Sequence, residues 1–314
     1  MSARPVVAPQ PPAQDRRRVV TWGEVSLGDG RPAVAVALTG PGPDELGTQA
    51  QRAAGAGADV LELRLDLLEV VQEGLAAPSG HCPRAGEPGD ADAVARSVAD
   101  AATQALSAVA QAAPGLPVLL TLRTAAEGGQ AALSDPAYGA TLLRLVRALQ
   151  AGAPDGPGGR AAAAALDVEL GRGCLAQVAS AAHGAGLDVV ASFHDFSGTP
   201  DEEEIVHCLA RMEAQGADVA KVAVMPHDPA DVARLLMATA RARESLGVPL
   251  VTMAMGELGV VTRVGGGVFG STLTFAVVPD PTGQETPSAP GQPPLVQVRA
   301  ALDLLTPRTS RWHG

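Results

Sequence analysis

The chain has 314 residues, 46% of them hydrophobic, which suffices for one large core such as a barrel of about 250 residues. Its net charge of −11 argues against a nucleic-acid partner, because phosphate binding requires clustered basic charge. The apolar runs are shorter than the roughly 18 residues that span a membrane, and the three widely spaced cysteines include no metal-ligand pair. We therefore expect a reduced cytoplasmic protein that binds no metal and contacts no membrane.

The first 32 residues contain two different segments. Residues 1–18 are rich in Pro, Ala, Gln and Arg and lack the apolar run of a secretion signal, so we expect a disordered tail. Residues 19–25 and 26–32 are short extended segments with a turn at Gly28-Asp29-Gly30, which predicts a β-hairpin. The hairpin would close the bottom of the domain that we expect to occupy residues 19–314.

Short apolar runs alternate with Ala-rich helical stretches in the rest of the chain, a pattern typical of βα units around a parallel sheet. The eight predicted strands are residues 33–38, 59–66, 117–123, 163–169, 187–193, 218–224, 248–254 and 271–278. Gly57, Gly186 and Gly216 stand between helices and strands, where helix C-caps belong. Eight units predict an α/β fold of the (β/α)8 TIM barrel type.

Three connections depart from a regular barrel. Residues 72–92, rich in Pro and Gly, predict an irregular insertion after the second strand, and residues 151–160 predict a flexible link. The connection between the last two strands is short for a helix. No G-x-G-x-x-G motif follows the first strand, which argues against an open nucleotide-binding sheet.

Lys221 is the only lysine among the 23 Lys and Arg residues of the chain. A site that needs only positive charge can use Arg, whereas imine formation requires a primary amine. Lys221 lies in the middle of an apolar predicted strand, where burial lowers the pKa of an ammonium group. We interpret it as a candidate nucleophile towards a carbonyl, with a buried salt bridge as the alternative.

Polar residues gather at the C-terminal ends of the predicted strands, where barrel enzymes build their active sites. Glu62, Arg64 and Asp66 alternate along one strand and share a face, and so do Asp167 and Glu169 on another. Such a face is either functional or a layer of ion pairs inside the barrel. For Asp66 and Asp167 the pattern favours the ion-pair layer.

Further candidates lie in the segments that follow the strands. His194 ends the fifth strand beside the strand of Lys221, and its ordinary pKa suits proton transfer near neutral pH. Glu127, in a Gly-rich loop, would either orient His194 or be an exposed turn residue. Arg263, between glycines, would pair with a substrate carboxylate, and Ser288 and Gln292 would bind hydroxyls or close as a lid.

Together these segments resemble the type I 3-dehydroquinate dehydratases over about nine-tenths of the chain. The resemblance rests on ELRLD (62–66), LRTAAEGGQ (122–130), LDVEL (166–170), SFHDFSGTP (192–200), ADVAKVAVMP (217–226), MAMGELGVVTR (253–263), FGSTLTFA (269–276) and SAPGQ (288–292). It implies dehydration of 3-dehydroquinate to 3-dehydroshikimate in the shikimate pathway, through an imine on Lys221 and without cofactor or metal. His194 would be the general acid and base, oriented by Glu127.

The resemblance also implies a set of substrate-binding residues. Glu62, Arg64 and Arg123 match positions that bind hydroxyls and organise the pocket, and Arg263 matches the carboxylate-binding arginine. Pocket wall and lid correspond to Phe275, Ser288, Ala289 and Gln292. Met253 and Met255 match the apolar floor, although core methionines on a strand would look the same. A homodimer is implied by the resemblance alone.

Some features depart from the family pattern or leave alternatives open. Ala37 stands where the family often has Ser, and residues 279–287 lengthen the lid loop, as the insertion at 72–92 lengthens another. An aldolase-type barrel enzyme would share the imine-forming lysine but break a carbon–carbon bond. A barrel that only binds a ligand is the non-enzymatic alternative. The pairing of His194 with Glu127 and the SAPGQ segment argue against the aldolase.

Overall fold

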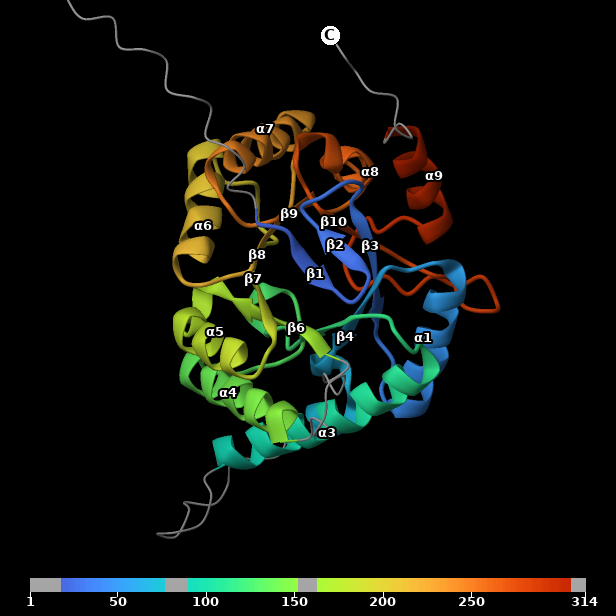
Figure 1. Ribbon diagram of the computed structural model, residues 1–314, viewed down its shortest axis with the longest axis vertical. Coiled ribbons are helices and arrows are strands. Elements are labelled where there is room, and N and C mark those ends of the chain that lie inside the picture. Colours follow the sequence, from blue (N-terminus) through green and yellow to red (C-terminus); the bar gives the residue numbers. More distant parts are fainter. Residues whose placement is uncertain (1–17, 77–89, 152–162, 306–314) are drawn as a thin grey trace, which may run out of the picture.

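The computed structural model describes residues 18–76, 90–151 and 163–305. Its main sheet has eight parallel strands in the order β10-β3-β4-β5-β6-β7-β8-β9. Helices surround this sheet on its outer side (Figure 1). Between β9 and β10 the ring nearly closes, where the backbone N–H of Thr272 donates to the carbonyl of Leu250 at 2.7 Å. The predicted (β/α)8 barrel is confirmed.

The barrel strands agree with the eight predicted runs to within a few residues. They are β3 (Ala33–Leu38), β4 (Val60–Arg64), β5 (Val118–Thr121), β6 (Ala163–Glu169), β7 (Asp188–Asp195), β8 (Val219–Val224), β9 (Leu250–Ala254) and β10 (Leu273–Ala276). The helices between and after them are α1 (Pro43–Ala56), α2 (Glu69–Ala76), α3 (Asp90–Ala112), α4 (Asp135–Ala151), α5 (Leu175–Gly184), α6 (Glu202–Ala214), α7 (Pro229–Ser245), α8 (Val260–Phe269) and α9 (Leu295–Leu305). Three short 3-10 helices follow β4, β5 and β6, namely η1 (Leu65–Leu67), η2 (Ala125–Glu127) and η3 (Leu170–Arg172).

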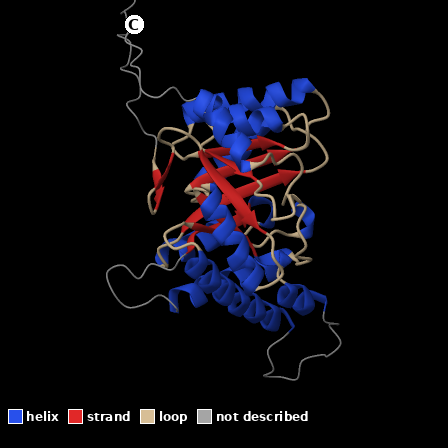
Figure 2. Cartoon of the chain, turned by 90° about the vertical axis from the view of Figure 1, so that its right-hand side faces the viewer, coloured by secondary structure: helices blue, strands red, loops and turns tan. Residues whose placement is uncertain are grey.

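The N-terminal hairpin exists, but its turn is not where the sequence predicts it. Strands β1 (Val20–Trp22) and β2 (Val25–Leu27) pair antiparallel with Trp22 opposite Val25, so the turn is Gly23-Glu24. Gly23 has a φ of 59°, which suits a two-residue hairpin turn. The predicted turn at residues 28–30 instead connects β2 to β3. The tighter turn is favoured because it directs Trp22 and Leu27 into the barrel. Figure 2 shows this small sheet at one end of the barrel.

The bottom of the barrel interior is apolar. The inward side chains of the strands pack there with three residues of the hairpin, Val20, Trp22 and Leu27. The strand residues of this layer include Val60, Leu119, Ala165, Val190, Val219, Val251 and Leu273. Trp22 is almost fully buried, and its indole N–H donates to Asp188 Oδ2 at 2.9 Å. The hairpin therefore seals the end of the barrel opposite to the C-terminal ends of the strands.

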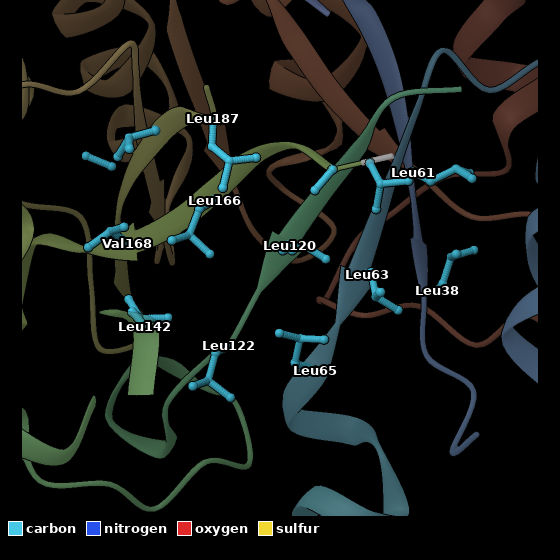
Figure 3. Close-up of a cluster of buried hydrophobic side chains, with 14 of the residues drawn as sticks. Leu38, Leu61, Leu63, Leu65, Leu120, Leu122, Leu142, Leu166, Val168 and Leu187 are labelled. Atoms are coloured by element: carbon cyan, nitrogen blue, oxygen red, sulfur yellow. The ribbon is translucent and has the colours of Figure 1, made fainter. Parts of the chain in front are cut away.

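A second apolar layer fills the space between the strands and the helices. Figure 3 shows its central part, with Leu61 and Leu63 of β4, Leu120 of β5, Leu166 and Val168 of β6, and Leu142 of α4 among the labelled side chains. These strand residues alternate with Glu62, Thr121 and Asp167. Because successive side chains of a strand point to opposite faces, packing of the leucines against the helices directs the polar residues into the barrel.

The connections were predicted with mixed success. Gly57, Gly186 and Gly216 all have positive φ at helix ends, as expected. The last connection contains a complete helix, α8, although it is short. Residues 72–76 and 90–92 of the predicted irregular insertion are helical, whereas 77–89 lie outside the described residues, as do 1–17 of the predicted tail and 152–160 of the predicted link. In the described ranges, no helix combines the length and apolarity needed to cross a membrane.

Candidate active site

All eleven residues that the sequence predicts for the site line one cavity at the C-terminal ends of the strands. They are Glu62, Arg64, Arg123, Glu127, His194, Lys221, Arg263, Phe275, Ser288, Ala289 and Gln292. The cavity contains about 470 Å³ that no atom fills, part of it open to solvent. Met253 and Met255 also line it, as expected. Gly128, Phe196 and Ala223 also line it and were missed; Gly128 directly follows Glu127 and Phe196 lies two residues after His194, so the sequence could have indicated these two.

Lys221 projects from β8 into the closed centre of this cavity, and its side chain is 6% exposed. Its Nζ lies 3.8 Å from Glu62 Oε1 and 3.8 Å from Asp167 Oδ2, too far for a hydrogen bond to either. The ammonium also faces the ring of Phe275, 4.6 Å from the ring centroid. The amine is therefore enclosed but does not form a tight ion pair.

Burial is the main reason why the pKa of Lys221 lies below its ordinary value. Glu62 and Asp167 oppose this effect because they favour the charged ammonium, whereas Arg123 and Arg64 add to it by repulsion. The effect of burial prevails. A lowered pKa makes the neutral amine, which is the nucleophilic form, more accessible near neutral pH.

His194 and Glu127 form a hydrogen-bonded pair at the edge of the cavity. His194 Nδ1 lies 2.8 Å from Glu127 Oε2, and the backbone N–H of His194 donates to the same oxygen at 3.1 Å. Because Oε2 already accepts the backbone N–H, it also acts as an acceptor towards the ring, which places the ring proton on Nδ1 and leaves Nε2 free to accept a proton. On β7, His194 is paired with Ala223 of β8 and lies two residues beyond Ser192, the partner of Lys221.

The two members of this pair have pKa values displaced in opposite directions. Burial raises the pKa of Glu127 to about 8, although Arg123 opposes the rise. Burial also holds the pKa of His194 well below its ordinary value, and repulsion by Arg123, Lys221 and Arg64 adds to this. Both displacements favour the uncharged form of the group, so His194 is neutral at neutral pH.

The loop that carries Glu127 depends on two glycines. Gly128 has a φ of 80°, a left-handed conformation that disfavours other residues. At Gly129, an added Cβ would lie 2.2 Å from the carbonyl oxygen of Arg123, a distance that the backbone cannot tolerate. The loop therefore folds back closely onto the end of β5, which brings Glu127 from a turn into contact with His194.

Arg123 is the centre of a buried ionic cluster. Its guanidinium lies 2.8 Å from Asp167 Oδ1, 3.1 Å from Glu169 Oε1 and 3.5 Å from Glu127 Oε2. It also donates to Ser192 Oγ at 3.0 Å. Burial alone would lower the pKa of Arg123, but the carboxylates raise it. The predicted ion-pair layer at Asp167 is present, and it adjoins Lys221, whose Nζ lies 3.8 Å from Asp167 Oδ2.

Two further interactions orient the side chains from β4. Arg64 donates to both carboxylate oxygens of Asp66, at 2.8 and 2.7 Å. Asp66 in turn accepts from the backbone N–H groups of Arg123 and Gln130. Glu62 accepts from the hydroxyl of Thr121 at 3.0 Å. Asp66 therefore has the structural role that the sequence favoured, while Glu62 and Arg64 face the cavity.

Arg263 is a buried cation without a carboxylate partner among the described residues. It is 1% exposed, and its guanidinium donates to the carbonyl of Pro290 at 3.0 Å and to Met253 Sδ at 3.5 Å. Its buried Nε has no partner in the described part of the chain. Burial lowers the pKa of Arg263 to about 10. Such an arrangement is suited to an anionic ligand that enters the cavity.

The SAPGQ segment lies over the cavity as a lid. Gln292 Nε2 donates to Ser288 Oγ at 3.0 Å, and its Oε1 accepts from the backbone N–H of Ser288. The backbone N–H of Gly256 donates to Pro290, and an added Cβ at Gly291 would lie 2.2 Å from the carbonyl oxygen of Gly256. The lid is thus docked against the segment after β9 by a contact that only glycine permits.

Two of the three departures from the family pattern, Ala37 and the lid loop 279–287, line the same hollow. Asp280 organises the lengthened lid loop, because its Oδ1 accepts from the backbone N–H groups of Thr282 and Gln284. Ala37 does not line the cavity of Lys221. It lines a neighbouring hollow of about 400 Å³ together with Asp280 and Gln284 of the lid loop.

The arrangement is suited to carbonyl chemistry on an anionic substrate. It combines a buried amine, a neutral imidazole held by a carboxyl group, and a buried arginine for which the described ranges contain no anionic partner. Groups of three His, Cys, Asp or Glu side chains that could hold a metal ion are not found in the described residues.

Comparison with known proteins gives a consistent result. Residues 34–308 match the family described as Type I 3-dehydroquinase. The 3-dehydroquinate dehydratase of Klebsiella pneumoniae subsp. pneumoniae is 36% identical over 290 residues, which cover 91% of this chain and 98% of that relative.

Two crystal structures of similar enzymes share the fold. The 3-dehydroquinate dehydratase of Geobacillus kaustophilus has a TM-score of 0.74 and 29% identity, covering 93% of this chain and 98% of that chain. The type I enzyme of Clostridium difficile, described with covalently modified comenic acid, has a TM-score of 0.74 and 28% identity over the same shares. The chain therefore belongs to the type I 3-dehydroquinases, the enzymes that dehydrate 3-dehydroquinate in the shikimate pathway.

Proposed function

We propose that the chain dehydrates 3-dehydroquinate through an imine between Lys221 and the ketone of the substrate. The observation that carries this proposal is the position of Nζ, which is enclosed in the cavity with both nearest carboxylates at 3.8 Å. An amine held in a tight salt bridge would have to break it before attack. The covalently modified comenic acid described with the Clostridium difficile enzyme also supports covalent chemistry.

The reaction begins with attack of the neutral amine on the ketone carbon. The carbinolamine loses water and leaves a protonated imine, which acts as the electron sink. His194 Nε2 then removes a proton from the carbon next to the imine carbon, and the electron pair moves into an enamine. The enamine expels the hydroxyl group on the next carbon, and the imidazolium returns its proton to that group as water leaves. Addition of water to the remaining imine releases the product and the amine of Lys221.

The other predicted residues have roles in binding and positioning. Arg263 pairs with the substrate carboxylate, because it is a buried cation whose Nε lacks a partner among the residues that the structure describes. Glu62, Arg64 and Arg123 bind hydroxyls and organise the pocket, with Phe275 as its wall. The lid residues Ser288, Ala289 and Gln292 cover the substrate. Glu127 orients the imidazole through the contact at Nδ1.

The decisive experiment is reduction of the substrate complex with borohydride, followed by intact-mass and peptide analysis. Lys221 is the only lysine of the chain, so the only other primary amine is the N-terminus. We expect one stable adduct on Lys221 and none in Lys221→Arg, which retains the charge but cannot form the imine. An unmodified wild-type protein that still produces the ultraviolet-absorbing enone would refute the imine. The enone itself separates dehydration from aldol cleavage.

The predicted assembly and location belong to the same proposal. We propose a homodimer in the cytoplasm that needs neither metal nor organic cofactor and has no nucleic-acid partner. Sedimentation equilibrium tests the dimer, and a monomer at micromolar concentration would contradict it. Exhaustive treatment with a chelator tests the absence of a metal requirement, and we expect activity to be retained.

A further inference from the structure

Glu169, the last residue of β6, has no role in the reaction proposed above and does not line the cavity. It is nevertheless fully buried, and four donors surround its carboxylate. Oε1 accepts from Arg123 Nη1 at 3.1 Å and from the backbone N–H of Thr124 at 2.8 Å. Oε2 accepts from the Thr124 hydroxyl at 2.6 Å and from Arg172 Nε at 3.1 Å. A buried carboxylate with so complete a set of donors has a single favoured position.

The partners of Glu169 are the residues that determine where Glu127 lies. Thr124 precedes η2, and its carbonyl accepts from the backbone N–H groups of Glu127 at 3.0 Å and Gly129 at 2.8 Å. Thr124 is thus the base of the loop that carries Glu127. Arg123, the second partner, lies 3.5 Å from Glu127 Oε2. Glu169 therefore holds the loop backbone and the guanidinium that neighbours the Glu127 carboxylate.

Arg172 closes this cluster from the outside. It follows Glu169 by three residues, lies 2.6 Å from Asp135 Oδ1, and also donates to the hydroxyl of Thr124. Its guanidinium faces the ring of Tyr138, whose hydroxyl accepts from the backbone N–H of Glu169 at 3.1 Å. The cluster consequently ties the end of β6 to both ends of the loop between β5 and α4.

We propose that Glu169 is a positioning residue of the reaction, which acts through Thr124 and Arg123 on Glu127 and so on His194. The proposal rests on the proposed role of His194 as acid and base. Displacement of a catalytic group by about 1 Å is sufficient to cost a hundredfold in rate. The alternative is that Glu169 belongs to an ion-pair layer that only stabilises the barrel.

The sharpest test is Thr124→Val, because it removes the hydroxyl that binds Glu169 but keeps the shape of the side chain. We expect kcat to fall about tenfold to a hundredfold, since the base of the loop loses one of its two bonds to Glu169. KM should change by less than about threefold, because Thr124 and Glu169 do not line the cavity. Borohydride trapping on Lys221 should persist. Thr124→Ser restores the hydroxyl and should restore kcat.

The control is Thr141→Val, which removes a hydroxyl from an equally buried threonine on α4; among the described residues this hydroxyl bonds only the carbonyl of Ala137. It should alter the melting temperature as Thr124→Val does, but leave kcat unchanged. The downfield proton resonance of the His194–Glu127 hydrogen bond, assigned by its absence in His194→Gln, provides a second measurement. It should shift or broaden in Thr124→Val and not in Thr141→Val.

Two results would overturn the proposal. One is wild-type kcat in Thr124→Val at any melting temperature, and the other is an equal loss of kcat in both valine variants. Either result would assign Glu169 to stability alone. Absence of a borohydride adduct in the wild type would instead refute the imine, and the kcat ratio of the two valine variants would still decide the role of Glu169.

Discussion

The two ends of the barrel interior are built on the same eight strands but have opposite chemistry. At the bottom, Val60, Leu119 and Val219 pack with Trp22 of the hairpin in an apolar layer. At the top, the same strands present Glu62 and Lys221 to a cavity with buried ionic groups. Apolar burial stabilises the fold, whereas burial of charges costs free energy unless they are paired. The comparison implies that stability comes mainly from the bottom and from the outer layer, and function from the top.

The largest expected effect is on the rate, from His194→Gln at the top. Loss of general acid–base catalysis should lower kcat by about a thousandfold. The adduct on Lys221 should still form with borohydride, and the melting temperature should stay close to that of the wild type. His207→Gln, an exposed histidine on α6, is the control. A wild-type kcat in His194→Gln would remove this residue from the mechanism.

A change at the bottom should lower the stability of the protein but leave kcat almost unchanged. Trp22→Ala removes a buried indole and its hydrogen bond to Asp188, so the free energy of unfolding should fall by about 3–5 kcal/mol. The remaining folded protein should have nearly the wild-type kcat, because Trp22 is distant from the cavity. Denaturant titration and kinetics on the same samples test this separation. A fall in kcat without loss of stability would contradict the division between the two ends.

Arg263→Met, at the top, should change activity and stability in opposite directions. Loss of the charged partner of the substrate carboxylate should lower kcat/KM by about a hundredfold. Removal of a buried cation that has no anionic partner in the described part of the chain should raise the free energy of unfolding by about 1 kcal/mol. Arg241→Met, at an exposed ion pair with Glu202, should change neither quantity. Destabilisation by Arg263→Met would show that this arginine has a structural role.

A smaller effect than these losses of activity is the pH dependence of stability from Glu127. Its folded-state pKa is raised to about 8, so the folded protein retains a proton that the unfolded chain releases near pH 4.5. The contribution of Glu127 to stability is complete below about pH 4.5 and is lost as pH rises to about 8. The free energy of unfolding of the wild type, relative to that of Glu127→Gln, should therefore fall by about 2 kcal/mol between pH 5 and pH 8. This figure allows for the nearby Arg123, which favours the ionised form of Glu127. Urea titrations at both pH values test this, with Glu257→Gln as an exposed control, and a constant difference would refute it.

Much of the site could be predicted, because the alternating pattern of the strands indicates which side chains point inward. The alternation of Glu62 and Arg64 with Leu61 and Leu63 implies that the polar pair points inward once the leucines pack against helices. The partners of Arg123 could not be predicted in this way. It was expected to bind substrate, and it does line the cavity, but its guanidinium also holds Asp167 and Glu169, which lie on a different strand.

Local periodicity predicts the eight strands, their inward and outward faces and the end of the barrel at which the polar residues gather. Which side chains meet depends on how the whole chain packs. The register of β7 against β8, the close return of the loop at Gly129 and the tighter turn at Gly23 arise from contacts between segments far apart in the chain or from the packing of the whole. For this reason Lys221 was recognisable from the sequence, whereas the support of Glu127 by Glu169 was not.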